Sequence, residues 1–222
     1  MESLHSTYTW NHVFPEVPKR IFDSVPNVKL IYLLRDPIDR IISHLHHDLY
    51  RGRFKYKNVD EVVLADSNYV QISQYYTQLS YYLQYFDMEN ILIMETSSLQ
   101  KDTNQALNEI CRFLGAQQFD FSKWIKARNQ SSRKYLIRYY DIAHKYLPRQ
   151  MSRLYHLLFY VANEKIARPI LSETTLLELK YRLATDINEL KKISGKEFKS
   201  WKTYNSIDLK NEVVINTSEK SY

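Results

Sequence analysis

The chain has 222 residues, of which 44% are hydrophobic and 25% are charged, and its formal net charge is +6. This length and apolar content suffice for one sizeable hydrophobic core, so we expect a single domain. The basic balance suits anionic ligands, nucleic acid or a membrane surface, and does not choose among them. Cys111 is the only cysteine, which excludes an internal disulfide. The longest apolar run, residues 154–162, is too short to span a bilayer.

The first regular elements are a short helix over residues 17–24 and an apolar run over residues 28–34. The run has the length and β-branched content of a buried central strand. A helix over residues 38–50 follows at once, because Asp36 suits an N-cap and Pro37 tolerates the missing donor at the first helical position. Its apolar residues recur at helical spacing and predict a face that packs on the sheet: Ile38, Ile41, Ile42, Leu45 and Leu49.

Arg35 lies at the carboxyl end of this strand, beside the start of the helix. Open α/β sheets bind ligands at that edge, and the backbone amides of a helix N-terminus favour an anion there. Ser43 comes eight residues later, two turns into the helix, and adds a hydroxyl donor. The same pattern also fits an ordinary strand-turn-helix unit with a solvated arginine.

A basic loop over residues 51–57 follows and is either a solvated connector or a loop that recognises an acceptor molecule. A helix over residues 69–86 is predicted next from one stripe of aromatic and aliphatic residues. A strand over residues 91–94 and a helix over residues 103–114 complete a second αβα unit. The chain holds 19 tyrosines, and because many of them lie on the core stripe, we expect no nucleic-acid partner.

The carboxyl-terminal half is predicted to be rich in helices. Helix follows helix after Arg133, with a break at Pro148, and the last long helix covers residues 173–194 and ends at Gly195 as its C-cap. Residues 203–222 are polar and weakly patterned, so we expect a flexible tail there.

Six segments, taken in order, resemble sulfotransferases that use 3′-phosphoadenosine 5′-phosphosulfate (PAPS), with a pattern close to bacterial and carbohydrate-type domains. The segments are residues 14–21 (F-P-x-V-P-x-R-I), 28–44, 73–86 (S-x-Y-x-x-Q-L), 90–95, 108–115 and 181–201 (Y…D-I-x-x-L…G…W). The resemblance implies an α/β fold, a P-loop-NTPase-like parallel sheet flanked by helices, over residues 1–202. It also implies PAPS as co-substrate, no metal, and sulfuryl transfer to a hydroxyl or amine, with carbohydrate as one candidate acceptor.

The resemblance assigns roles to four residues near the first strand. Arg35 and Ser43 match, in type and spacing, the arginine and serine that bind the cofactor's 3′-phosphate. Tyr75, within the S-x-Y element, is expected in the cofactor or acceptor cleft. Ser73 is its expected companion, as a donor near the 3′-phosphate.

Further roles fall near the amino terminus and in the middle of the chain. The stretch 6–9 resembles the segment just after the family's catalytic base, so Glu2 is the preferred base, with His5 as the alternative. Residues 126–134 resemble the segment that closes over the nucleotide, or they are a basic turn and helix start. Arg128 and Arg133 are the candidates for a cofactor clamp, since guanidinium forks suit phosphate.

One part of the family's pattern is not found in the sequence. The family binds the 5′-phosphosulfate with a K-x-G-T-[ST] loop between a strand and a helix, upstream of the arginine. A tight backbone cradle needs glycine, and none of the three glycines here lies in such a loop. We therefore expect a domain that is truncated at its amino terminus and lacks its first βαβ unit, and a companion chain is one source of the missing loop.

Three further alternatives stay open at this point. The chain is either an active enzyme or a catalytically inactive remnant that binds adenosine 3′,5′-bisphosphate weakly or serves as a partner module. The cluster of His44, His46, His47 and Asp48 is a weak metal-site signal, and a solvated or substrate-facing helix surface is the preferred interpretation. No signal peptide opens the chain, so a native N-terminus implies a cytoplasmic protein, whereas a fragment leaves the location open.

Overall fold

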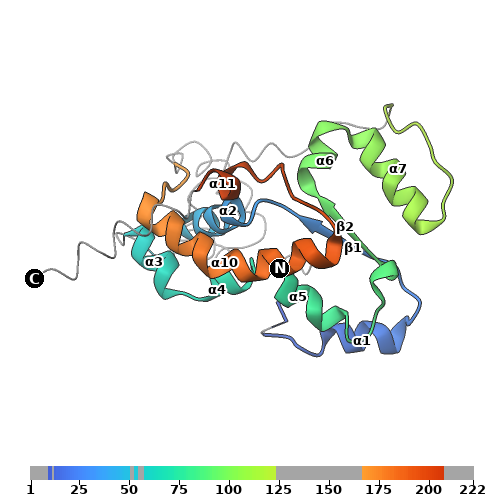
Figure 1. Ribbon diagram of the computed structural model, residues 1–222, viewed down its shortest axis with the longest axis horizontal. Coiled ribbons are helices and arrows are strands. Elements are labelled where there is room, and N and C mark those ends of the chain that lie inside the picture. Colours follow the sequence, from blue (N-terminus) through green and yellow to red (C-terminus); the bar gives the residue numbers. More distant parts are fainter. Residues whose placement is uncertain (1–9, 12, 51–52, 55–57, 124–166, 208–222) are drawn as a thin grey trace, which may run out of the picture.

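The computed structural model describes residues 10–11, 13–50, 53–54, 58–123 and 167–207 (Figure 1). The described residues form nine α-helices, two strands and a 3-10 turn, η2, over Met88–Asn90. The elements are α1 (Val17–Ser24), β1 (Leu30–Leu34), α2 (Pro37–Tyr50), α3 (Val59–Ala65), α4 (Asn68–Gln71), α5 (Tyr75–Tyr82), β2 (Ile91–Glu95), α6 (Thr96–Lys101), α7 (Thr103–Leu114), α10 (Glu173–Ser194) and α11 (Lys202–Ser206).

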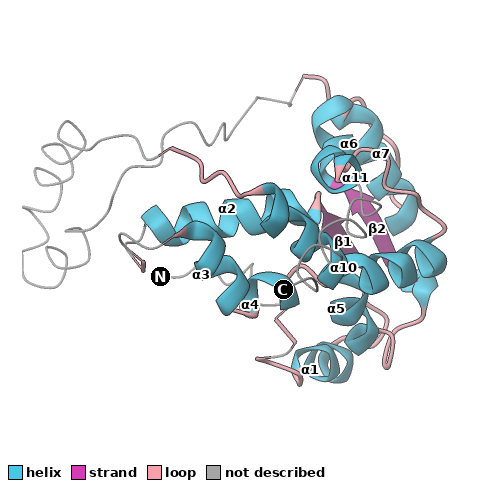
Figure 2. Cartoon of the chain, turned by 60° about the vertical axis from the view of Figure 1, so that its left-hand side comes forward, coloured by secondary structure: helices cyan, strands magenta, loops and turns pink. Residues whose placement is uncertain are grey.

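The two strands are parallel, with Leu30 opposite Ile91 and Leu34 opposite Glu95. Helices lie around this pair, as expected for parallel strands, which need crossover connections and burial on their faces. Figures 1 and 2 show α5 and α10 near each other, whereas α3 and α7 lie at opposite ends of the molecule. The predicted α/β class, with a parallel sheet flanked by helices, is confirmed in the described part of the chain.

The core is one buried cluster that includes the end of β1 and the apolar stripes of α2 and α10. Leu34 at the end of β1 is fully buried, and so are single faces of the two helices. The fully buried helix residues are Ile38, Ile41 and Leu45 of α2 and Leu179, Leu183, Ile187 and Leu190 of α10. Their spacing of three and four residues places each set on one side of its helix. The predicted end of the last long helix is also confirmed, because Gly195 adopts a left-handed conformation with φ of +64°.

The predicted helix over residues 69–86 was wrong in one respect: it is two helices. Helix α4 ends at Gln71 and α5 begins at Tyr75. The carboxylate of Asp186, on α10, accepts hydrogen bonds from the backbone amides of Tyr76 and Thr77 and so provides α5 with an N-terminus of its own. The break is therefore made by a residue more than a hundred positions away, which no local pattern reveals.

The first residues of the expected tail, over 203–222, form regular structure instead. Residues Lys202–Ser206 form α11, and Tyr204 is buried. The rest of that predicted tail, from residue 208 on, lies outside the described residues. Short helices α3 and α6 were not predicted. None of the helices in the described ranges is both long enough and apolar enough to cross a membrane.

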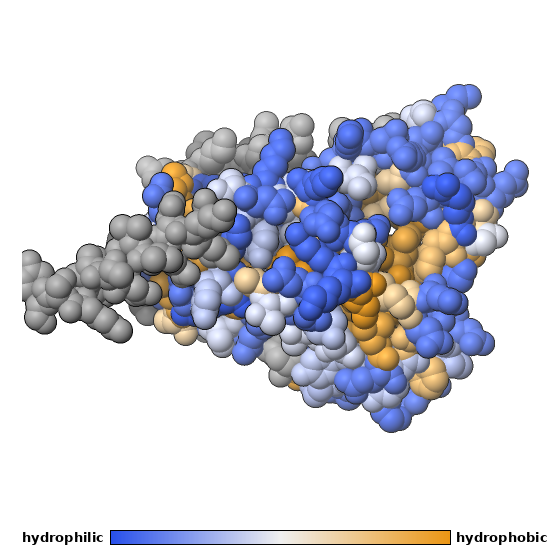
Figure 3. Space-filling view, viewed as in Figure 1, coloured by the Kyte–Doolittle hydropathy of each residue, from blue (hydrophilic) through white to orange (hydrophobic). Residues whose placement is uncertain are grey.

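The outer side of β1 is less covered than the rest of the core. Ile31 and Leu33 are 39% and 46% exposed, although they lie in a strand of the central sheet. Figure 3 shows hydrophobic side chains at the surface between the region of α1 and the region of α7. This exposed apolar surface contrasts with the other face of β1, where Leu34 is fully buried.

Candidate functional site

The turn between β1 and α2 is fixed from two directions. Asp36 caps α2, because its Oδ1 accepts hydrogen bonds from the amides of Ile38 at 3.0 Å and Asp39 at 3.2 Å. Its second oxygen, Oδ2, accepts from the amide of Tyr204 at 2.9 Å. Burial raises the pKa of Asp36 above its ordinary value, while these hydrogen bonds oppose the shift. The carboxyl group thus joins the turn to α11.

Arg35 and Ser43 lie along one side of α2. The Arg35 guanidinium turns back over the helix, and its Nη2 donates to the carbonyl oxygen of Asp39 at 3.0 Å. Asp39 and Ser43 are four residues apart and therefore share a helix face. Both Arg35 and Ser43 are partly exposed, and the Ser43 hydroxyl has no hydrogen-bond partner within the part of the chain that the structure describes. The two predicted phosphate donors are therefore brought to the same strip of α2.

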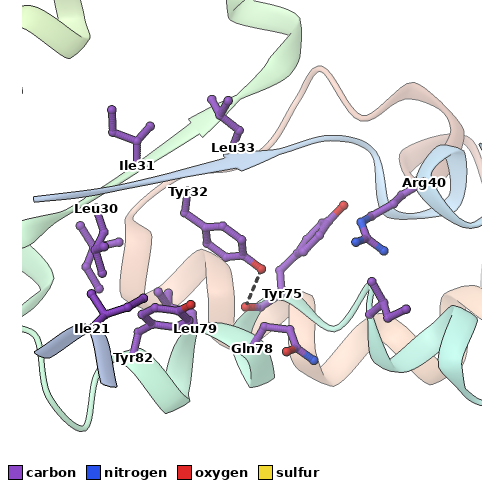
Figure 4. Close-up of a pocket in the computed structure, with 12 residues that line it drawn as sticks. Ile21, Leu30, Ile31, Tyr32, Leu33, Arg40, Tyr75, Gln78, Leu79 and Tyr82 are labelled. Atoms are coloured by element: carbon purple, nitrogen blue, oxygen red, sulfur yellow. Dashed lines mark hydrogen bonds between the residues drawn. The ribbon is translucent and has the colours of Figure 1, made fainter. Parts of the chain in front are cut away.

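Tyr75 holds the backbone of Arg35. Its hydroxyl donates to the Arg35 carbonyl oxygen at 2.9 Å, and its ring lies edge-on to Tyr32 at a centroid distance of 6.1 Å. The Tyr32 hydroxyl donates in turn to the Tyr75 carbonyl oxygen at 3.5 Å, a long contact drawn as the dashed line in Figure 4. Burial raises the pKa of Tyr75 to about 12, so its hydroxyl stays protonated at neutral pH. In this arrangement Tyr75 positions the Arg35 turn.

Asp186 positions Tyr75 from the opposite side. Besides the amides of Tyr76 and Thr77, its carboxylate accepts the Thr77 hydroxyl at 2.7 Å. Burial raises the pKa of Asp186, and the hydrogen bonds to it oppose that shift. Asp186 is not among the predicted site residues. Asp186 is the aspartate of the motif over residues 181–201, so that motif pointed to this residue in the sequence.

The remaining support comes from the segment after α10. Trp201 is buried, stacks on Phe198 at a centroid distance of 4.2 Å, and lies 5.7 Å from the ring of Tyr75. The Thr203 hydroxyl donates to Asp39 Oδ1 at 3.2 Å. The carboxyl-terminal segment therefore packs against both the Arg35 turn and the tyrosine that holds it.

Ser73 lies in the break between α4 and α5 and is fully buried. Its Oγ has no hydrogen-bond partner, and because the residue is enclosed, a ligand does not reach it in this arrangement. Its predicted contact with the 3′-phosphate stays a prediction. The predicted bases Glu2 and His5 and the predicted clamp residues Arg128 and Arg133 lie outside the described residues, so their roles stay predictions as well.

The histidine-rich side of α2 is organised around Asp48. The Tyr69 hydroxyl donates to Asp48 Oδ2 at 2.8 Å, Arg53 Nη1 lies 3.2 Å from Oδ1, and the ring of His44 packs edge-on against Tyr69 at 4.8 Å. Burial lowers the pKa of His44. Within the described ranges, no group of three or more histidine, cysteine or acidic residues is arranged to hold a metal ion.

Neither glycine of the described residues forms a phosphate cradle. Gly115 and Gly195 both have positive φ and serve as the C-caps of α7 and α10, while Gly52 lies outside the described residues. The described part of the chain therefore contains residues that fit a 3′-phosphate but no glycine loop for a 5′-phosphosulfate.

Residues 9–122, about half of the chain, match the sulfotransferase domain family. The chain therefore belongs to that family of transferases, whose members generally use PAPS as the sulfuryl donor. The predicted family is confirmed by a match that includes β1, α2, α5 and β2, and with them the turn at Arg35.

Two curated relatives agree with this assignment. The chain is 28% identical to luciferin sulfotransferase from Photinus pyralis over 100 residues, which are 44% of this chain and 26% of that protein. It is 26% identical to sulfotransferase 2B1 from Homo sapiens over 118 residues, which are 51% of this chain and 32% of that protein. The matched regions thus span between a quarter and a third of these relatives.

A solved structure supports the fold. The crystal structure of a sulfotransferase from Alicyclobacillus acidocaldarius superposes with a TM-score of 0.54 and 16% sequence identity. The match covers 85% of this chain and 63% of that one. At this identity the likeness concerns the fold alone, and it agrees with the predicted P-loop-like arrangement of a parallel sheet between helices.

Proposed function

We propose that this chain carries the 3′-phosphate half of a PAPS-dependent sulfotransferase site and takes part in sulfuryl transfer to a hydroxyl or amine. The observation that carries the proposal is the placement of Arg35 and Ser43 on one side of α2. The backbone of Arg35 is held there by Tyr75, and the adjacent Asp36 is held by Tyr204. Such preorganisation reduces what ligand binding costs in ordering the site.

The side chains, rather than the helix N-terminus, are the expected phosphate donors. Asp36 already accepts hydrogen bonds from two amides of the first turn of α2, and its carboxylate opposes the attraction of an anion to that end. The Arg35 guanidinium supplies a charged, planar donor pair that suits phosphate oxygens. The Ser43 hydroxyl supplies a further donor one turn beyond Asp39.

PAPS supplies an activated sulfuryl group, which an in-line transfer moves to the acceptor oxygen or nitrogen. By analogy with phosphoryl transfer, the protein must position both ends, offset charge and provide a base. We propose Glu2, with His5 as the alternative, as that base, and Arg128 and Arg133 as a clamp on the cofactor. The loop for the 5′-phosphosulfate is proposed to come from outside the described residues, with a companion chain as one source.

The acceptor is proposed to be a small molecule or a carbohydrate with a free hydroxyl or amine. The word luciferin in the name of the Photinus pyralis relative describes that protein and is not carried over to this chain. Residues 51–57 are proposed to contact the acceptor, since a basic loop at the mouth of an α/β site is where such contacts vary. Arg53, at the start of the loop, pairs with Asp48 and so attaches the loop to α2.

Calorimetric titration with adenosine 3′,5′-bisphosphate tests the proposal, with AMP as the ligand that lacks the 3′-phosphate. We expect binding of the bisphosphate, with Arg35→Ala weakening it about tenfold or more and Ser43→Ala less, because the arginine makes the charged contacts. Arg112→Ala is the matched control, since Arg112 is an exposed arginine near the end of α7. Equal binding of AMP, or an unchanged affinity of Arg35→Ala, would contradict the proposal.

A second candidate function is a catalytically inactive homologue that binds the bisphosphate weakly or serves as a partner module. The absence of a glycine cradle from the described residues favours it. Transfer of label from radiolabelled PAPS to a mixed panel of phenol, sugar and amine acceptors separates the two. Label transfer that Arg35→Ala abolishes supports the enzyme, whereas bisphosphate binding without transfer supports the inactive homologue.

A further inference from the structure

Arg40 is a charged side chain of α2 that follows Arg35 by five positions and is partly buried. Among the described residues, its guanidinium forms no ion pair and no hydrogen bond. The acidic residues of the same turn have other partners. Asp36 accepts hydrogen bonds from backbone amides, and Asp39 pairs with Arg168 at 2.7 Å. Arg40 therefore places a positive charge inside the protein that no nearby carboxylate offsets.

The surroundings of Arg40 are unfavourable for a charge. The side chains that line the same cavity are mostly apolar and aromatic, and Figure 4 shows the guanidinium directed toward Tyr75. Burial lowers the pKa of Arg40. An ionised group taken partly out of water costs free energy, and such groups in proteins are normally paired. Stability of the fold therefore does not explain a cation at this position.

The charge of Arg40 acts on the same turn as Arg35. The Tyr75 hydroxyl donates to the Arg35 carbonyl oxygen at 2.9 Å, so Tyr75 contacts the backbone of one arginine and faces the guanidinium of the other. Burial raises the pKa of Tyr75, and the charges of Arg40 and Arg35 both oppose that shift. The Arg35 charge also adds to the lowering of the Arg40 pKa. Two cations that repel each other in this way are both stabilised by an anion bound near them.

We propose that Arg40 is a specificity-determining residue of the phosphate site, whose charge favours a doubly charged phosphate at Arg35 over a singly charged group. This role rests on the proposed function, because the ligand is the 3′-phosphate bound by Arg35 and Ser43. Arg35 makes the contact, whereas Arg40 acts through its electric field from beneath the turn. Coulomb energy is proportional to the charge of the ligand, and salt screens a partly buried charge only weakly. A phosphate monoester is close to doubly charged at neutral pH, whereas a phosphate diester carries one charge.

A purely structural role for Arg40 predicts the opposite effect on stability. Removal of a side chain that packs or hydrogen-bonds within the fold lowers the free energy of unfolding. Replacement of a buried, unpaired charge by an apolar side chain of similar length instead leaves stability unchanged or raises it. Residues kept for function often reduce stability in this way. Stability and ligand affinity, measured on the same variants, therefore separate the two roles.

The test uses the full 222-residue chain and three variants. Arg40→Met removes the charge and keeps the length of the side chain, and Arg40→Lys keeps the charge. In calorimetric titration with adenosine 3′,5′-bisphosphate, Arg40→Met should bind about fivefold more weakly, which corresponds to about 1 kcal/mol. Arg40→Lys should bind within about twofold of the unmodified chain, because Lys carries the same charge. Arg112→Met is the matched control, since it removes one positive charge at an exposed position of α7 and should leave the affinity unchanged.

Two further measurements test the charge itself. In urea denaturation without ligand, Arg40→Met should have a midpoint equal to or above that of the unmodified chain. The second uses the monomethyl ester of the 3′-phosphate of the same nucleotide, which carries one charge in place of two. Arg40→Met should weaken binding of this ester only about twofold, because half the charge gives half the interaction energy. The preference for the bisphosphate over the ester should therefore fall about twofold in Arg40→Met and stay unchanged in Arg112→Met.

Four outcomes overturn the proposal. Weaker binding by Arg40→Met together with a lower urea midpoint would assign Arg40 a structural role. Equal losses in Arg40→Met and Arg40→Lys would show that the shape of the side chain matters and its charge does not. If Arg35→Ala removes binding but Arg40→Met binds like the control, the role of Arg40 fails while the proposed function stands. If the folded, unmodified chain does not bind the bisphosphate, both fail together.

Discussion

The carboxyl end of β1 and its outer edge differ in how completely they are covered and hydrogen-bonded by other parts of the chain. At its carboxyl end, Tyr75 holds the Arg35 carbonyl, Tyr204 holds Asp36, and Asp186 holds the start of the helix that carries Tyr75. At its free edge, Ile31 and Leu33 are exposed and Arg40 has no acidic partner among the described residues. The comparison indicates that the Arg35 turn, the proposed phosphate site, is held by contacts within the described residues, whereas the side chains along the outer face of β1 are left partly exposed.

The largest effect expected around the Arg35 turn comes from removing the carboxylate that starts α5. Asp186→Ala leaves two amides and a hydroxyl of the α5 N-terminus without their acceptor. Hydrogen bonds to a charged group contribute roughly 1.5–3 kcal/mol each and are not additive, so we expect a loss of about 3 kcal/mol in the free energy of unfolding. Urea denaturation measures it, with exposed Asn188→Ala as the control on the same helix. A loss below about 1 kcal/mol would show that Asp186 does not organise α5.

A smaller effect is expected from the hydroxyl that holds the Arg35 turn. Tyr75→Phe keeps the ring against Tyr32 and Trp201 and removes only the donor to the Arg35 carbonyl. The loss of one neutral hydrogen bond should cost about 1 kcal/mol in stability and weaken adenosine 3′,5′-bisphosphate binding about fivefold. Tyr181→Phe, at an exposed tyrosine of α10, is the control. Lower stability with unchanged nucleotide affinity would separate Tyr75 from the binding site.

The pH dependence of stability sharpens the comparison within α2. Because burial lowers the pKa of His44, the unfolded chain binds a proton there more readily than the folded chain. The contribution of His44 to stability is therefore present above its ordinary pKa and is lost as the pH falls toward the lowered folded value. Between about pH 7.5 and about pH 5, His44→Gln should lose less stability than the unmodified chain.

Two other groups act in the opposite direction over a lower range. The raised pKa values of Asp36 and Asp186 mean that the folded chain binds protons there more readily than the unfolded chain. Their shifts therefore favour the folded state as the pH falls toward about 4 and oppose it as the pH rises. The difference between His44→Gln and the unmodified chain isolates His44 from this background, with His46→Gln measured alongside as the control. Identical pH profiles for all three proteins would contradict a titrating role for His44.

The smallest effect is expected at the open edge. Leu33→Thr keeps a strand-forming residue and changes only an exposed side chain, so the free energy of unfolding should stay within about 0.5 kcal/mol of the original value. Leu34→Ala, at the fully buried neighbour, should by contrast cost about 2–5 kcal/mol. Thermal unfolding of the two variants measures the contrast. A large loss with Leu33→Thr would mean that the exposed face of β1 is already packed in solution.

Much of the fold followed from patterns that span only a few residues. The apolar run before Arg35 predicted a strand, although it begins at Leu30 rather than at residue 28. The Asp36 cap, the stripe along α2 and the Gly195 end of α10 were also predicted, and the structure agrees. Each depends on neighbours one to four positions apart, which a sequence displays directly. The family was predicted in the same way, from short motifs in the right order.

Local patterns thus predicted both strands, the helices α2 and α10, and the arginine that follows β1, because sterics, capping and side-chain periodicity act between near neighbours. Long-range packing instead sets the start of α5 at Tyr75, the contact of α11 with the Arg35 turn, and the cavity that Arg40 lines. The first two rest on Asp186 and Tyr204, which lie 110 and 168 positions from their partners. Contacts of that separation arise from packing, and no local pattern in the chain encodes them.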